Sequence, residues 1–229
     1  MKFHILKILR FLKLLIFLVF ENLFLLIFHP RKKNFAGEIV LITGSANGIG
    51  RQIALNFAPL GATLVLWDID EEGNKETSRL AQQNGATRVF AYHCDCSNRE
   101  EVYEQADKTC KAFLPAMMTW NRGHLVSTAS SAGLLGVYRM SDYAASKHAI
   151  IGMMEALHSE LYHAGKHGIK TTVICPYFVN TDLIKGLQTP LFLPVYDAEY
   201  VASKIMDAIQ KEKFYLIMPP ILHLLAFKM

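Results

Sequence analysis

The stretch from Glu38 to Asp68 constrains this chain more than any other. An apolar run, Ile39 to Ile42, leads into a turn with glycines at positions 44, 48 and 50, and apolar residues at helical spacing follow. That order predicts a buried strand, a glycine turn and a helix that begins at the turn. The first amides of a helix have no partner inside it and its dipole is positive at that end, so a pyrophosphate group can bind there.

A second apolar run, Thr63 to Trp67, ends in Asp68, twenty residues after Gly48. An acid at the tip of the second strand accepts hydrogen bonds from an adenosine ribose and repels a 2′-phosphate. Strand, turn, helix, strand and acid in this order predict a dinucleotide-binding unit. A glycine-rich loop without a ligand is the alternative that the pattern leaves open.

The N-terminal segment carries much of the chain's apolar character, which is 52% of 229 residues overall. Residues 3–28 are dominated by Leu, Ile, Phe and Val, but Glu21 interrupts them, and basic residues recur at positions 7, 10 and 13. A spanning helix and a helix lying at the membrane interface both stay open, and the basic arc favours the interface. A basic HPRKK run follows instead of a cleavage site, which predicts a retained anchor over residues 1–30 with a cytosolic flank.

Charge and cysteine content exclude other classes. Much of the net charge of +4 lies before residue 34, so nucleic acid is not expected as a partner. The four cysteines have neither paired spacing nor neighbouring histidines. This pattern indicates reduced thiols rather than a metal site or disulfides.

The rest of the chain predicts alternating helices and strands. We expect an exposed helix over 71–83, a long helix from about Asn98 to Met117, and helices over 141–163 and 197–211; the strands fall at 88–93, 123–127, 169–175 and 215–218. A parallel strand needs a crossover of a dozen or more residues. Between Asp95 and Gly123 there is room for one helix and no strand, which is anomalous for a doubly wound sheet.

Tyr143 and Lys147 stand one helical turn apart, and Ser130 precedes the tyrosine by thirteen residues. A phenol titrates near pH 10, and a neighbouring ammonium favours the phenolate, which brings proton exchange closer to neutral pH. A hydroxyl at the end of the preceding strand can hold a carbonyl oxygen against the phenol. Tyrosine and lysine at this spacing are common on helix surfaces, so the pair gains its meaning from the dinucleotide turn before it.

These motifs resemble the short-chain dehydrogenase/reductase family, most closely its membrane- and lipid-droplet-associated branch of retinol and hydroxysteroid dehydrogenases. The resemblance implies an α/β fold with a Rossmann-type doubly wound parallel sheet over residues 37–218. It also implies cofactor-binding residues, which are Gly44, Ser45, Asn47, Gly48, Ile49, Gly50, Asp68, Asp95, Lys147, Pro176 and Thr181. Tyr177 stands where the family usually has glycine.

The resemblance implies a mechanism as well. Tyr143 exchanges the hydroxyl proton, Ser130 steadies the oxygen, and Lys147 tunes the tyrosine while bonding the nicotinamide ribose. Asp68 favours NAD, although Arg51 leaves NADP open. A lipophilic alcohol, ketone or aldehyde, retinoid or steroid, is the expected substrate, and a homodimer is the family's usual assembly. The expected location is the endoplasmic reticulum membrane or a lipid droplet, with the catalytic domain facing the cytosol.

One part of the family pattern is missing. The family's Asn-Asn-Ala-Gly strand end and its later catalytic asparagine are absent, which predicts an internal deletion near residues 111–112 and a sheet that lacks one central strand and helix. We expect either a hole in the core or forced pairing of the flanking strands. The apolar tail, residues 219–229, also looks cut short. The alternative function is a catalytically inactive, membrane-anchored remnant that retains at most partial cofactor binding.

Overall fold

A computed structural model describes residues 33–95, 114–181, 184 and 194–222. The predicted N-terminal anchor, the first part of the long helix expected from Asn98, and most of the apolar tail lie outside these residues. Within them, no helix is both long and apolar enough to cross a bilayer.

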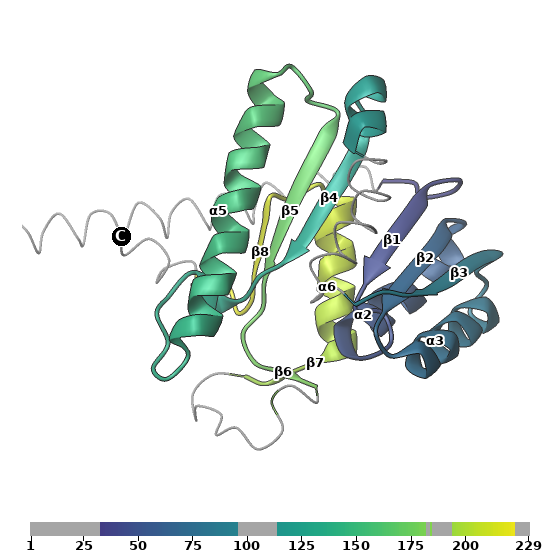
Figure 1. Ribbon diagram of the computed structural model, residues 1–229, viewed down its shortest axis with the longest axis horizontal. Coiled ribbons are helices and arrows are strands. Elements are labelled where there is room, and N and C mark those ends of the chain that lie inside the picture. The colour runs from purple at the N-terminus through teal and green to yellow at the C-terminus, as the bar shows by residue number, and fades with distance from the viewer. Residues whose placement is uncertain (1–32, 96–113, 182–183, 185–193, 223–229) are drawn as a thin grey trace, which may run out of the picture.

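The first half of the fold is a β-α-β-α-β unit, as predicted (Figure 1). Its elements are β1 (Ile39–Thr43), α2 (Gly48–Phe57), the 3₁₀ turn η1 (Ala58–Leu60), β2 (Thr63–Asp68), α3 (Glu71–Gln83) and β3 (Arg88–His93). The three strands are parallel in the order β1-β2-β3. Local signals fix the helix α3, because Asp70 caps its first turn by accepting from the amide of Gly73 at 3.0 Å.

The second half repeats the parallel arrangement with different strands. Residues 114–120 are helical and lead into the following elements: β4 (Gly123–Thr128), the 3₁₀ turn η2 (Ser131–Gly133), α5 (Ser141–His163), β5 (Ile169–Cys175), β6 (Val179–Asn180), β7 (Tyr196–Asp197), α6 (Ala198–Gln210) and β8 (Tyr215–Ile217). The second sheet has the order β4-β5-β8, and β6 and β7 form a small pair of their own. The helices predicted over 141–163 and 197–211 are confirmed to within one residue at each end.

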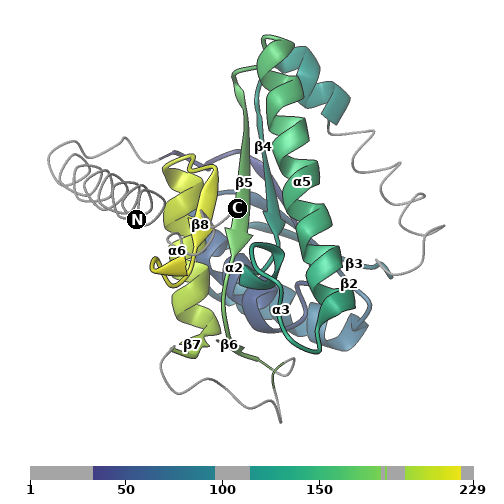
Figure 2. The ribbon, with the colours of Figure 1, turned by 90° about the vertical axis from the view of Figure 1, so that its left-hand side faces the viewer.

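Strand β5 is covered on both faces, as Figure 2 shows for α5 on one side and α6 on the other. Val173 and Cys175 pack against Met154 of α5, whereas Ile174 faces the opposite way, into a cluster with Ile205 of α6. The cluster that contains Ile174 and Ile205 also contains buried side chains of β1 and β2, which are Ile42, Leu64 and Leu66. Helix α6 therefore belongs to a core shared by the two halves.

The two sheets are not continuous through the described residues. There, β1 is hydrogen-bonded to β2 alone, and β4 to β5 alone. Forced pairing of β1 with β4 does not occur. A salt bridge between Arg122, just before β4, and Glu38, just before β1, links the beginnings of these two strands.

Two expectations about side chains have clear outcomes. Helix α3 was expected to be exposed, and on one face this is wrong, since Asn74, Thr77 and Ala81 are buried. The expectation for the thiols agrees with the described part of the chain, where Cys94 and Cys175 are buried and unbonded to each other. Burial raises the pKa of the Cys175 thiol to about 12. No cluster of metal-binding side chains occurs among the residues searched, which are those the structure describes.

Candidate active site

The glycine turn between β1 and α2 has the backbone that the sequence predicts. Gly44 and Gly48 adopt positive φ angles of 67° and 50°, which glycine tolerates at little cost. Asn47 caps the helix, because its side-chain oxygen accepts from the amide of Gly48 at 2.6 Å. The turn thus presents the N-terminus of α2 directly beyond the end of β1, where a phosphate group would meet backbone amides and the positive end of the helix dipole.

Two glycines permit close approaches. A Cβ on Gly50 would lie 1.9 Å from the carbonyl oxygen of Gly44, so a larger residue would force the turn open. A Cβ on Gly48 would lie 3.3 Å from Cγ2 of Thr181. Thr181, expected to help hold the nicotinamide carboxamide, is therefore brought beside the turn from far along the chain.

Asp68 lies at the end of β2 beside the turn. Its Oδ2 accepts from the amide of Ala46 at 2.8 Å, and its Oδ1 accepts from the amide of Asp70 at 2.9 Å. The carboxylate is half-buried and carries further lone pairs, so it can still accept from a ribose hydroxyl. Asp95 follows β3 at the neighbouring strand end, since the amide of Cys94 donates to the carbonyl of Asp68 at 3.0 Å.

The Ser45 side chain faces the protein interior. It is fully buried, and its hydroxyl lies 2.8 Å from Oδ1 of Asn74 and 3.1 Å from the carbonyl of Trp67. The side-chain Nδ2 of Asn74 donates in turn to the carbonyls of Leu66 and Tyr92, which lie near the ends of β2 and β3. Asn74 was missed by sequence reasoning. Its spacing with Thr77 and Ala81 on one face of α3 was the available signal.

The second group of candidates follows β4 and begins α5. Ser130 caps the 3₁₀ turn η2, and its Oγ accepts from the amide of Ala132 at 3.2 Å. Tyr143 and Lys147 are both half-buried on α5, and Nζ of Lys147 lies 5.6 Å from the centroid of the Tyr143 ring. Nζ also donates to the carbonyl of Thr128 at 3.2 Å, and burial lowers the pKa of Lys147.

Close packing joins η2 to α5. A Cβ on Gly133 would lie 2.7 Å from the carbonyl oxygen of Lys147, so η2 and α5 meet there without a side chain between them. At the end of β5, the carbonyl of Pro176 accepts from the amide of Ser131 at 2.9 Å. The hydroxyl of Ser130 reaches the same carbonyl at 3.5 Å. Ser130 therefore lies where three chain segments meet: the turn after β4, the helix α5 and the residues that follow β5.

Figure 1 shows the arrowheads of β1 and β4 directed the same way, with the first residues of α5 beyond the end of β4. The glycine turn and the Ser130, Tyr143 and Lys147 group therefore stand at corresponding ends of the two sheets. Open α/β sheets bind their ligands outside the carboxyl ends of the strands, which is where both groups lie.

Comparisons with known proteins bear on this arrangement. A family model described as short chain dehydrogenase matches residues 106–190, and a second, described as Enoyl-(Acyl carrier protein) reductase, matches residues 44–113. Short-chain dehydrogenase/reductase family 16C member 6 of Bos taurus is 42% identical over 263 residues, covering 95% of this chain and 83% of that protein. Epidermal retinol dehydrogenase 2 of Mus musculus is 44% identical over 255 residues, covering 91% and 82%.

Estradiol 17-beta-dehydrogenase 11 of Macaca fascicularis is 37% identical over 259 residues, covering 94% of this chain and 86% of that protein. Among solved structures, a short chain dehydrogenase/reductase from Burkholderia phymatum in complex with NAD superposes with a TM-score of 0.72. It is 26% identical, with 85% of this chain and 93% of that chain covered. The fold is shared with a short-chain dehydrogenase from Sphingobium yanoikuyae in complex with NADPH, at 20% identity and a TM-score of 0.70. The match covers 80% of this chain and 88% of that chain.

These alignments are longer than the chain. The alignment with the bovine relative spans 263 positions and the chain has 229 residues, so at least 263 − 229 = 34 positions have no residue here. Even so, relatives well above 30% identity are covered over four fifths of their length. The chain belongs to the short-chain dehydrogenase/reductase family of oxidoreductases.

Proposed function

We propose that this chain is an NAD-dependent oxidoreductase that interconverts a lipophilic alcohol and its carbonyl compound. The observation that carries the proposal is the placement of Lys147 over the ring of Tyr143, on a helix packed against the turn that holds Ser130. The names of the relatives, retinol and estradiol dehydrogenases, support a retinoid or steroid as substrate.

The residues at the two sheet ends fit a dinucleotide. The Gly44 position has no neighbouring atom within 4 Å of a built Cβ, so the turn is open on that side. The turn and the N-terminus of α2 would hold the pyrophosphate, Asp68 the adenosine ribose, Asp95 the adenine, and Pro176 with Thr181 the carboxamide. Asp68 favours NAD, and NADP stays compatible with the fold. When bound, the nicotinamide supplies the hydride acceptor or donor.

The chain's own residues would manage the proton and the substrate oxygen. The Tyr143 phenolate accepts the hydroxyl proton of an alcohol and becomes the phenol, and the positive charge of Lys147 stabilises the phenolate before that transfer. An ammonium has three donors, so the bond to Thr128 leaves Lys147 able to reach a ribose hydroxyl. The Ser130 hydroxyl holds the substrate oxygen after leaving its long contact with Pro176.

The test is turnover of all-trans-retinol and estradiol with NAD in membranes that contain the full chain. We expect Tyr143→Phe to lower the rate by a factor on the order of 10² or more, because it removes the acid-base group. Tyr162→Phe, at an exposed tyrosine on the same helix, is the matched control and should retain the wild-type rate. Wild-type membranes no more active than vector membranes would refute the proposal for these substrates.

A second candidate is an inactive protein that binds dinucleotide partially or not at all. The discontinuity between β1 and β4 favours it, together with the 34 or more alignment positions that lack a residue here. Both features support an internal deletion near residues 111–112 that removed a central strand and helix. A rise in melting temperature on adding NADH, with no turnover of any alcohol tested, would select binding without catalysis.

The N-terminal residues 1–30 supply the proposed anchor, which would place the domain on the cytosolic face of the endoplasmic reticulum or on lipid droplets. The composition of this segment supports it. Cell fractionation of the full chain, with and without residues 1–30, tests it, since loss of the segment should release the chain to the soluble fraction. Chemical crosslinking of the same membranes tests the expected homodimer.

A further inference from the structure

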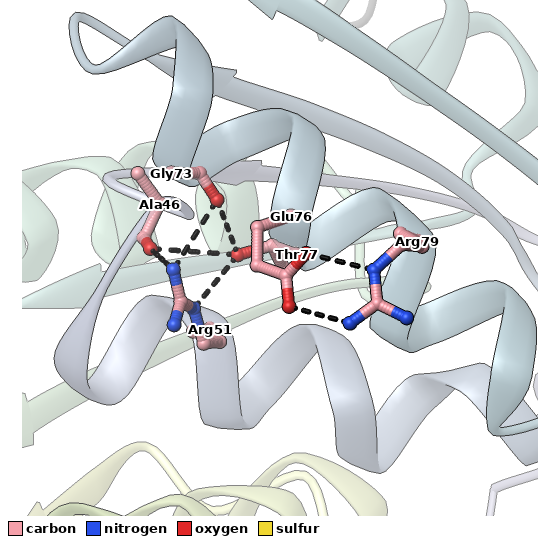
Figure 3. A network of polar contacts seen from close by, with 6 residues as sticks. All are labelled: Ala46, Arg51, Gly73, Glu76, Thr77 and Arg79. Atoms are coloured by element: carbon pink, nitrogen blue, oxygen red, sulfur yellow. Dashed lines mark hydrogen bonds and ion pairs between the residues drawn. The ribbon is translucent and has the colours of Figure 1, made fainter.

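Arg51 follows the glycine turn in sequence, yet its side chain is used inside the protein. Its Nε donates to Oγ1 of Thr77 at 3.0 Å, and its Nη2 donates to the carbonyl of Gly73 at 3.3 Å and to that of Ala46 (Figure 3). Gly73 and Thr77 lie one turn apart on α3. The guanidinium therefore ties the turn to the helix that packs beside it.

Thr77 continues this tie to the next peptide group. Its side chain is fully buried, and its hydroxyl lies 2.9 Å from the carbonyl of Ser45 and 3.0 Å from that of Gly73. A hydroxyl has a single proton to donate and can also accept. Thr77 thus accepts from Arg51 while it donates to a carbonyl, and the Ser45 carbonyl is the shorter contact.

The Ser45–Ala46 peptide group is also held from its other side, and the Ser45 side chain is held beside it. The amide of Ala46 donates to Asp68, and the hydroxyl of Ser45 lies 2.8 Å from Oδ1 of Asn74. A Cβ on Gly73 would lie 3.0 Å from Cβ of Ala46, so the glycine lets α3 approach this closely. Because a peptide unit is planar, fixing the carbonyl of Ala46 also fixes the direction of the Asn47 amide, which opens α2.

We propose that Arg51 and Thr77 are positioning residues that hold the peptide groups of Ser45 and Ala46 and thereby set the affinity of the glycine turn for its dinucleotide. This inference rests on the proposed cofactor site. Amides that already point at a ligand lose little entropy on binding, so their clamp contributes to affinity without touching the cofactor. The guanidinium donates to backbone carbonyls inside the protein rather than to a 2′-phosphate. Arg51 therefore contributes equally to the binding of NADH and of NADPH.

The experiment uses the full chain in detergent micelles, with hydrogen–deuterium exchange of residues 44–50 and fluorescence titration with NADH and NADPH. Arg51→Ala and Thr77→Val should each speed exchange in the turn, leave α5 unchanged, and raise the Kd of both cofactors about tenfold. Thr77→Ser keeps the hydroxyl and should restore values within about twofold of wild type. Arg79→Ala is the control, because Arg79 lies on the same helix and pairs with Glu76 at 2.6 Å, away from the turn (Figure 3).

Each other outcome decides a different point. Unchanged exchange in both variants would overturn the clamp. Faster exchange with unchanged Kd would overturn its role in binding, and a selective loss of NADPH would make Arg51 a phosphate ligand instead. If the wild-type chain binds neither cofactor while exchange responds, the proposed function fails and the positioning role fails with it, but the clamp itself stands.

Discussion

Strands β1 (IVLIT) and β5 (IKTTVIC) are both short and parallel to their neighbours, and β1 is the more apolar in sequence, yet the two strands lie in different environments. Six of the seven residues of β5 are buried, whereas β1 has one buried residue of five, and Ile39 is 60% exposed. β5 has a strand on each edge and a helix on each face, but β1 is hydrogen-bonded on one edge within the described residues. Burial of an apolar strand is thus set by its partners rather than by its composition.

The face of the first sheet that carries Ile39 extends the contrast. The register aligns Leu41 with Val65 and Phe90, and Thr43 with Trp67 and Tyr92, on one side of the sheet. Phe90 and Tyr92 are about half exposed, while the opposite side buries Leu64 and Leu66 against α2 and α6. The described part of the chain therefore covers one face of the first sheet, but both faces of β5 in the second.

The sharpest test of this contrast is the same substitution in both strands. Ile174→Ala in β5 should lower the free energy of unfolding by about 2–5 kcal/mol, because it leaves a cavity in a closed core. Ile39→Ala should cost below about 1 kcal/mol, since much of that side chain is already in water. Urea unfolding of the full chain in micelles measures both. Equal losses would show that the outer side of β1 is covered.

The second sheet also contains a half-buried imidazole, His124, which makes its stability depend on pH. Burial, and next the charge of Lys33, lower the pKa of His124 to about 4, and its Nε2 lies 2.7 Å from Oγ1 of Thr172. The unfolded chain takes up this proton near pH 6.5 and the folded chain does not. Stability is therefore full above pH 6.5 and falls by roughly 3 kcal/mol as the pH drops toward 4.

Urea unfolding at several pH values checks this expectation. His124→Gln should remove this component of the pH dependence, whereas His163→Gln, at an exposed position near the end of α5, should leave it intact. A His124→Gln profile that matches wild type between pH 6.5 and 4 would show that the imidazole is protonated in the fold.

A buried side-chain amide, that of Asn74, links the strands β2 and β3 of the first sheet, whereas apolar contacts stabilise β5 in the second sheet. Asn74 is 1% exposed and bonds carbonyls near the ends of β2 and β3, so Asn74→Ala should cost about 1–3 kcal/mol by leaving those carbonyls without this partner. Gln83→Ala, at the exposed end of the same helix, is the control. Thermal unfolding in micelles measures the stability of both variants. If Asn74→Ala is as stable as wild type, water must bind those carbonyls in place of the side chain.

The smallest effect is expected at the salt bridge between the two sheets. Arg122 is largely exposed, so Arg122→Ala should cost about 0.2–1 kcal/mol, and the loss should shrink in high salt. Arg88→Ala, an exposed arginine of β3, controls for net charge. Unfolding at low and high NaCl gives the comparison. A loss well above this range that persists in salt would make the pair a structural tie between the halves.

Sequence reasoning placed the candidate site but not the scaffold around it. The glycine turn, the acid after β2 and the Tyr143–Lys147 spacing are local patterns, and the structure contains each where expected. The inward direction of Ser45, the clamp through Arg51 and the burial of Asn74 involve residues more than twenty positions apart. Nothing in the local sequence says which carbonyl a buried side chain will meet.

By itself the sequence determined the order of the longer helices and strands that the structure describes, though not the short pair β6 and β7. It also determined the left-handed turn that needs glycine and the one-turn spacing of Tyr143 and Lys147, because caps, periodicity and backbone sterics act over a few residues. It also indicated that a strand was missing. Only the tertiary structure decided that β1 and β4 do not pair with each other, that α6 packs on both halves and that α3 buries a polar face against the turn. Those outcomes depend on which distant surfaces meet, and the free energy of burying them is shared by segments that no local pattern connects.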